Sequence, residues 1–419
     1  MLKMSFSSLV LVVCLWQAGW AQNLTLDSVL TKAERNYPLI KQFDLTKKAE
    51  QFSLDNISRG VWPQVMIAGQ ASYQSDVTQL SIPIPGFSAP EMSKDQYRLY
   101  GEINQSLTDL ITNKYQKEAI KANAEIENQK LETDLYKVKE RVLQLYFGLL
   151  LADNQTSQLS ILRKDLENAL KTTKAAVENG VAIVGSEDVL EAELIRLDQK
   201  ITEGKAASEA FRQMLGAFIQ EELGYETQLE MPKSTDMVNG KLRPELILFD
   251  SQKRAIDAQS QLISSKTYPR FSLFLQTGVG RPALNMLDND FSMYYLGGLR
   301  LQWNISSFYT QSKEQEVLDT QKELVEVQRE AFLFGNQLQL LQQETEINKW
   351  KKLLESDAKL VELRQKITRT SASKLENGTI TSTEYLTHVN AEDQARKNLI
   401  LHDIQSILAQ YQKKLTTGM

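Results

Sequence analysis

The placement of proline constrains the fold of this 419-residue chain more than any other feature. All nine prolines lie within 38–90 and 232–282, so two long stretches, 91–231 and 283–419, contain none. Proline inside a helix removes a backbone donor and clashes with the preceding turn, so long helices exclude it. Each proline-free stretch therefore permits helices far longer than those of an ordinary globular domain.

The chain also contains an internal duplication. Pro38 and Pro63 are 25 positions apart, and so are Pro244 and Pro269. Three further matches occur in the same order: Phe43-Asp44 with Phe249-Asp250, Glu178-Asn179-Gly180 with Glu376-Asn377-Gly378, and Ser186 to Leu190 with Ser382 to Leu386. Such ordered matches indicate two copies of one structural unit. We place the first copy at 22–232 and the second at 233–419.

Each copy contains two segments in which apolar and polar residues alternate, within about 62–107 and about 268–307. Each segment is about ten residues long, the length that a tilted strand needs to cross a bilayer. Aromatic residues, which are typical of membrane interfaces, occur at the segment ends: Trp62, Tyr73, Tyr97, Tyr268, Phe271, Tyr294, Tyr295 and Phe308. A small soluble sheet with one buried face is the alternative. The aromatic ends favour four membrane strands, which are too few to close a barrel without strands from other chains.

Polar side chains occupy alternate positions near the ends of two of these strands: Glu102, Asn104, Ser106, Arg300, Gln302 and Asn304. In a barrel they would line the lumen, where charge can bias which solutes pass. The plainer interpretation is that they are merely hydrated by a water-filled pore.

Behind each pair of strands the apolar period changes to that of a coiled coil. Apolar residues recur every 3.5 positions on average, at Leu131, Leu135, Val138, Val142, Leu145 and Leu149, and in the second copy at Leu401, Ile404, Leu408, Tyr411 and Leu415. The pattern predicts two helical hairpins, at about 109–220 and 309–415, with outgoing arms on the order of 100 Å long. Gly204 and Ser208 predict a close approach of neighbouring helices. A pure coiled-coil scaffold is the alternative for these arms.

The hairpins turn at 178–186 and 376–382. In each turn a glycine is expected to end the first helix, and Ser186 or Ser382, followed by acidic residues, is expected to start the next.

The N-terminus predicts a signal peptide over 1–21. Lys3 precedes an apolar run from Leu9 to Trp16, and Gly19 and Ala21 supply the small residues of a cleavage site. A retained anchor is the alternative, but the run is shorter than the ~20 residues that span a bilayer. Lipidation at Cys14 is disfavoured because Val13 is large where a small residue is needed.

Composition argues against several classes of protein. Lys plus Arg number 48 against 53 Asp plus Glu, a formal charge of −5, so there is no basic surplus for nucleic acid. The single cysteine, Cys14, lies in the predicted signal, and the two histidines, His388 and His402, are too far apart for one helical metal site. We therefore predict no catalytic, cofactor-binding or metal-binding residues, and no enzyme.

These features together resemble the TolC-like outer-membrane efflux proteins. The stretch Leu24-Thr25-Leu26-Asp27-Ser28-Val29-Leu30, followed by Asn36-Tyr37-Pro38, is similar to the amino-terminal signature of that family, and the paired Glu-Asn-Gly turns are similar to its hairpins. The similarity covers essentially the whole chain after the signal.

The resemblance implies a mainly α fold with a small β part, assembled as a homotrimer. Twelve strands would close one barrel in the outer membrane of a Gram-negative bacterium, and the helices would continue as a periplasmic tunnel. The expected function is a passive exit duct of a tripartite efflux pump or type I secretion system, coupled to an inner-membrane pump through a periplasmic adaptor. The alternative is a periplasmic adaptor or a coiled-coil scaffold of an envelope transport complex. The duplication argues against an adaptor, because adaptors normally have one hairpin.

The resemblance also places adaptor docking at the hairpin tips. The residues concerned are Gly180, Val181, Ile183, Val184, Gly185 and Ser186, and Gly378, Thr379, Ile380, Thr381 and Ser382. The alternative is that these residues only close the hairpins. Some relatives carry acidic rings above the tips, but 367–375 contains no carboxylate and Lys171 and Lys174 occupy the matching stretch, so we predict no anionic gate.

Overall fold

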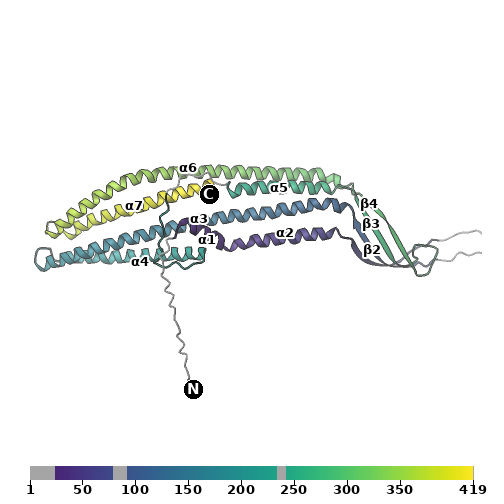
Figure 1. Cartoon of the computed structure of the whole chain (residues 1–419), viewed down its shortest axis with the longest axis horizontal. Coiled ribbons are helices and arrows are strands. Elements are labelled where there is room, and N and C mark those ends of the chain that lie inside the picture. Colours follow the sequence, from purple (N-terminus) through teal and green to yellow (C-terminus); the bar gives the residue numbers. More distant parts are fainter. Residues whose placement is uncertain (1–23, 79–91, 234–241, 419) are drawn as a thin grey trace, which may run out of the picture. The chain divides into compact units, whose positions relative to one another are not determined.

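The computed structural model describes residues 24–78, 92–233 and 242–418, and it consists of long helices and one small sheet (Figure 1). The elements are α1 (Leu26–Asn36), η1 (Pro38–Ile40), α2 (Lys41–Gly60), β1 (Gln64–Tyr73), β2 (Asp95–Ser106), α3 (Thr108–Glu178), α4 (Ser186–Ile219), α5 (Pro244–Ser265), β3 (Arg270–Arg281), β4 (Ser292–Gln302), α6 (Ser307–Glu376) and α7 (Ser382–Thr417). This confirms the predicted mainly α fold with four strands. The predicted signal peptide, 1–21, lies outside the described residues.

The two proline-free stretches contain the two longest helices. Helix α3 has 71 residues and α6 has 70, and each begins within two residues of the position predicted from the sequence. In each half of the chain a helix is followed by two strands, a long helix and a shorter helix.

The described residues form two compact units, which we describe separately. The hairpin unit contains 24–37, 135–233 and 338–418, and the strand unit contains 38–78, 92–134 and 242–337. Each unit takes residues from both halves of the chain. The two compact units therefore do not coincide with the two copies of the sequence duplication.

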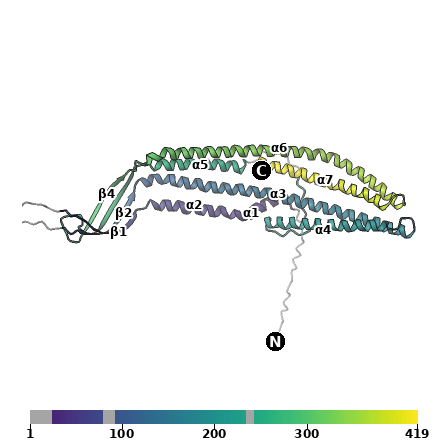
Figure 2. The same cartoon turned by 180° about the vertical axis from the view of Figure 1, so that it is seen from behind.

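In the hairpin unit, α4 lies along the second part of α3 and α7 lies along the second part of α6 (Figures 1 and 2). The predicted apolar seam of α3 is buried from Leu135 to Leu149, and Leu149 is 0% exposed. Tyr146, also 0% exposed, donates its hydroxyl to the carbonyl oxygens of Leu24 (2.7 Å) and Glu230 (2.6 Å). The seam therefore packs within one chain, and Tyr146 beside it also fixes the segments that flank the hairpin.

Helices α3 and α4 approach closely where small residues were predicted to allow it. A Cβ atom at Gly204 would lie 2.4 Å from Thr156 Oγ1, and Ser208 Oγ donates to Asp153 Oδ1 at 2.5 Å. Asp153 also pairs with Arg212 (2.5 Å), which donates to the carbonyl oxygen of Gly224 at 2.8 Å. The close approach is confirmed.

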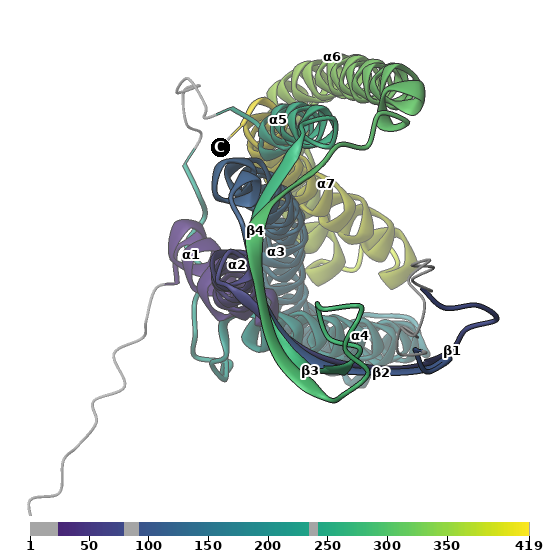
Figure 3. The same cartoon turned by 90° about the vertical axis from the view of Figure 1, so that its right-hand side faces the viewer.

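In the strand unit, the strands form one antiparallel sheet in the order β1-β2-β3-β4, a single curved layer in Figure 3. Because β1 follows α2 and β4 leads into α6, this order places α2 and α6 at the two edges of the unit. Between them, Asn113 of α3 donates to the Ile57 carbonyl oxygen of α2 at 3.0 Å, and the rings of Phe249 in α5 and Phe332 in α6 lie 6.0 Å apart.

Candidate functional site

One face of the sheet is apolar and exposed. The register pairs Val65 with Ile103, Leu99 with Val279 and Leu273 with Leu299, so odd-numbered residues share this face across all four strands. Its leucine, isoleucine and valine side chains are between 38% and 80% exposed: Val65, Ile67, Leu99, Ile103, Leu273, Leu275, Val279, Leu299 and Leu301. The strands are 10 to 12 residues long, which matches the thickness of a bilayer for a tilted strand.

The opposite face carries most of the polar residues predicted to line a lumen. Glu102, Asn104 and Ser106 of β2 share it with Arg300 and Gln302 of β4. Glu102, whose side chain is 11% exposed, forms an ion pair of 3.3 Å with Arg300, which lies 4.6 Å from the centre of the Phe274 ring. The structure brings these two predicted residues together.

Asn304 lies outside the strands. Strand β4 ends at Gln302, and the Asn304 side chain accepts a hydrogen bond of 2.6 Å from Ser306 Oγ in the turn before α6. The sequence alternation was extended too far here, because a turn residue can continue a polar and apolar alternation by coincidence. The same alternation could have found Arg98 and Arg270, which we did not select although both lie on the polar face.

Both hairpin tips begin with the same backbone motif. Gly180 has a φ of +70°, its N–H donates to the Val177 carbonyl oxygen, and the Val181 N–H donates to that of Ala176. Gly378 has a φ of +68°, its N–H donates to the Leu375 carbonyl oxygen, and the Thr379 N–H donates to that of Lys374. The paired bonds and the left-handed glycine satisfy the last carbonyls of each helix, which explains the Glu-Asn-Gly sequence at both tips.

The helices after the tips start at the predicted serines, but neither serine is the capping residue. Helix α7 is capped by Thr381, whose Oγ1 accepts the Glu384 N–H at 3.2 Å. Helix α4 follows Gly185, which has a φ of +90° and no side chain to cap with. Ser382 is instead 2% exposed, and its hydroxyl has no hydrogen-bond partner among the described residues.

The two tips contact each other within the hairpin unit and border a groove of about 650 Å³, which we call the tip groove. Eight of the eleven predicted docking residues line it: Val181, Ile183, Ser186, Gly378, Thr379, Ile380, Thr381 and Ser382. Gly180, Val184 and Gly185 do not. Val184 is 86% and Ile183 70% exposed, so the first tip presents apolar side chains to solvent.

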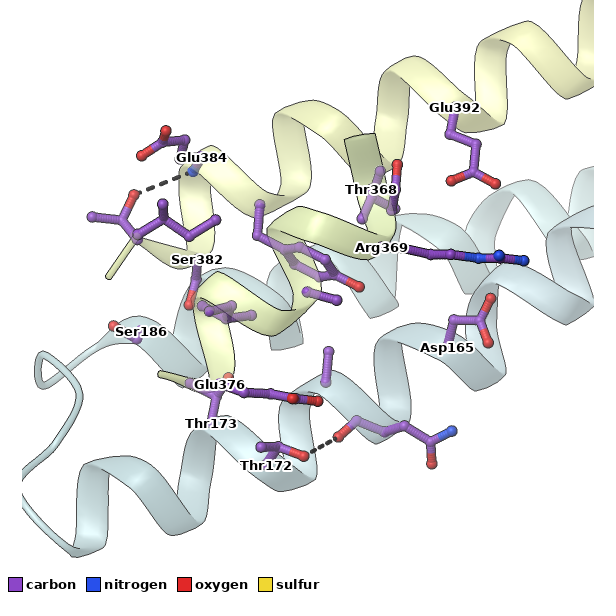
Figure 4. A pocket seen from close by; sticks show the side chains of 18 of the residues that line it. Asp165, Thr172, Thr173, Ser186, Thr368, Arg369, Glu376, Ser382, Glu384 and Glu392 are labelled. Atoms are coloured by element: carbon purple, nitrogen blue, oxygen red, sulfur yellow. Dashed lines mark hydrogen bonds between the residues drawn. The ribbon is translucent and has the colours of Figure 1, made fainter. Parts of the chain in front are cut away.

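Charged residues missed by the sequence analysis line the groove above the tips. Figure 4 shows Arg369 of α6 extending toward the part of the groove where Asp165 of α3 and Glu392 of α7 lie. Partial desolvation, and then the Glu392 carboxylate, raise the pKa of Asp165 above its ordinary value, while Arg396 opposes the shift. Nothing in the sequence distinguishes these residues from the many other charges on the helices, because the sequence does not show which of them face a neighbouring hairpin.

Within residues 24–78, 92–233 and 242–418, no three metal-ligating side chains gather at one place. None of the helices described has a stretch long and apolar enough to cross a membrane.

The chain has the fold of the TolC-like outer-membrane channels. It matches the outer-membrane channel OprN with a TM-score of 0.69 and 14% sequence identity, over 94% of this chain and 90% of that one. It matches the outer-membrane protein VceC of Vibrio cholerae with a TM-score of 0.68 and 12% identity, over 94% and 96% of the two chains. The open Neisseria gonorrhoeae MtrE channel gives a TM-score of 0.67 at 13% identity, over 94% and 89%. No protein-family model and no curated protein matches the sequence.

Proposed function

We propose that this protein is a subunit of a homotrimeric channel in the outer membrane of a Gram-negative bacterium. The channel would be the passive exit duct of a tripartite efflux pump or a type I secretion system, and a periplasmic adaptor would open it. The observation that carries the proposal is the sheet, which exposes a bilayer-length apolar face and whose edge strands, β1 and β4, pair with no further strand among the described residues. In lipid, every backbone polar group needs a partner, so strands of neighbouring chains would have to pair with β1 and β4.

The edge helices support assembly through the same two edges. Helix α2 exposes Leu45 and Phe52, and α6 exposes Val317 and Leu324, all between 55% and 64%. Each pair is spaced by seven residues, as in a coiled-coil seam. Phe52 lies eight residues before the end of α2 and Val317 ten residues after the start of α6, so they are at similar heights from the sheet. Pairing of α2 with α6 of the next chain would bury both seams and close a ring.

Adaptor docking at the tips is supported by their exposed apolar side chains and by the tip groove. Short loops closed by glycine present backbone groups and small side chains that a helical partner can pack against.

Extraction from purified outer membranes tests the proposed function. We expect a heat-modifiable trimer that forms conducting pores in planar bilayers. Recovery as a water-soluble monomer would contradict it and would favour a periplasmic adaptor or scaffold.

A pair of exposed substitutions tests docking without disturbing the core. Val184→Asp at the tip should reduce drug resistance or secretion while trimers still form. Ile195→Asp, at an exposed apolar residue of α4 outside the tip, is the matched control and should leave transport unchanged. Equal transport by both variants would contradict the docking assignment.

A further inference from the structure

We propose that the polar face of the sheet makes the channel prefer anionic solutes over cationic ones. This inference rests on the proposed function, in which the polar face lines the lumen. It names the charge class of the solutes that pass most readily.

The charges of the sheet are distributed unequally between its two faces. The polar face carries Arg98, Arg270 and Arg300 but only one carboxylate, Glu102. The other charged strand residues, Asp95 and Arg281, form an ion pair with each other on the opposite face. Each chain therefore contributes a net positive charge to the polar face, although the whole chain has a formal charge of −5.

The single carboxylate is also the least accessible of these groups. The Glu102 side chain is 11% exposed and lies against Arg300, whose own side chain is 46% exposed. Arg98 and Arg270 are exposed as well, and no ion pair is formed by either among the described residues. On this face the guanidinium groups are therefore exposed to solvent, whereas the carboxylate of Glu102 is mostly buried.

The arginines occupy both ends of the strands. Arg270 lies opposite Gln302 and Arg300 opposite Ser272, next to the helices, whereas Arg98 lies opposite Gly280 at the far end. Along the strands, the level of Arg98 is about 26 Å from that of Arg300 and about 33 Å from that of Arg270. A solute crossing the barrel would pass positive charge on entering and on leaving. A low-dielectric wall of one sign raises the local concentration of the opposite ion.

Planar-bilayer recordings of the purified trimer under a KCl gradient test this inference. We expect the wild type to favour chloride over potassium. The variant Arg98→Gln/Arg270→Gln/Arg300→Gln should lose this preference, with a chloride-to-potassium permeability ratio lower by a factor on the order of 10. Glu102→Gln should change the ratio in the opposite direction. Both effects should weaken at high salt, where the screening length is short.

A matched control removes three positive charges from exposed helical positions instead, by Arg35→Gln/Arg141→Gln/Lys352→Gln. This control should shift the chloride-to-potassium permeability ratio much less than the strand variant does. A cation-selective wild-type channel, an unchanged ratio in the strand variant, or equal shifts in both triple variants would overturn the inference while leaving the channel function intact. Failure to form any conducting pore would instead contradict the proposed function itself.

Discussion

The two units of the chain use apolar residues in opposite ways. In the hairpin unit, seam residues such as Leu149 are fully buried by other parts of the same chain. In the strand unit, residues of the same type are left uncovered, and Leu299 of β4 is 60% exposed. The hairpin unit therefore has its own core, whereas the apolar surface of the strand unit is left exposed by the described chain, and under the proposed function lipid and neighbouring chains would cover it.

The largest effect is expected in the core of the hairpin unit. Leu149→Ala removes a fully buried side chain, and we expect it to lower the free energy of unfolding by about 2–5 kcal/mol. Ile195→Ala, at a residue that is 63% exposed in the same unit, should change it by less than about 0.5 kcal/mol. Chemical denaturation in detergent measures the free energy of unfolding of both variants. Equal losses would show that this unit has no hydrophobic core of its own.

In the strand unit, the effect of a new charge on stability should depend on which face of the sheet carries it. Leu299→Arg places a charge on the apolar face and should cost about 2–4 kcal/mol of stability in a bilayer. Gln276→Arg adds the same group to the polar face, where water can solvate it, and should be tolerated. The yield of folded trimer in outer membranes measures the difference. If the polar-face variant were the more damaging of the two, the assignment of the faces would be reversed.

The tips provide a smaller comparison within the hairpin unit. Gly180→Ala and Gly378→Ala should each cost about 1–2 kcal/mol, because both glycines have positive φ. The cost at Gly378 should be the larger, since its new Cβ would lie 3.1 Å from the Val181 carbonyl oxygen, whereas the space at Gly180 is open. Hydrogen exchange of the tip peptides measures both variants. Identical protection would argue against contact between the two tips.

The smallest effect concerns pH in the tip groove. Because the pKa of Asp165 is raised, the folded state holds its proton at pH values where the unfolded state has lost it. The free energy of unfolding should therefore fall as the pH rises above about 4. Hydrogen exchange in α3 around Asp165, corrected for intrinsic rates, should show weaker protection at pH 7 than at pH 4. Asp165→Asn should remove this difference, and its persistence would assign the effect to another group.

Much of the fold follows from local sequence patterns. The absence of proline permits α3 and α6, and a change of apolar period from two to 3.5 predicts where the strands give way to helices. The alternation also predicts which side chains share a face of the sheet. The observed register agrees with it, and a shift of one residue would move every apolar side chain to the other face.

Features made by distant segments could not be predicted in this way. Asp153 and Arg212 lie on different helices, and so do Asp165 and Glu392, so only the packing of α3 against its neighbours brings them together. The capping of α7 by Thr381 rather than Ser382 depends on one pair of backbone angles. The boundaries of the sequence copies and the role of the docking residues stay predictions.

Cross-linking between the edges of the strand unit tests most directly whether one chain supplies only part of a pore wall. In Phe52→Cys/Val317→Cys, each chain would carry one thiol on α2 and one on α6, and the rest of the chain after the predicted signal has no cysteine. A short bis-maleimide reagent applied to outer membranes should join each α2 to the α6 of its neighbour and yield covalent trimers, while either single variant should yield none. If the double variant yielded only monomers, this would contradict the claim that one chain supplies only part of a pore wall.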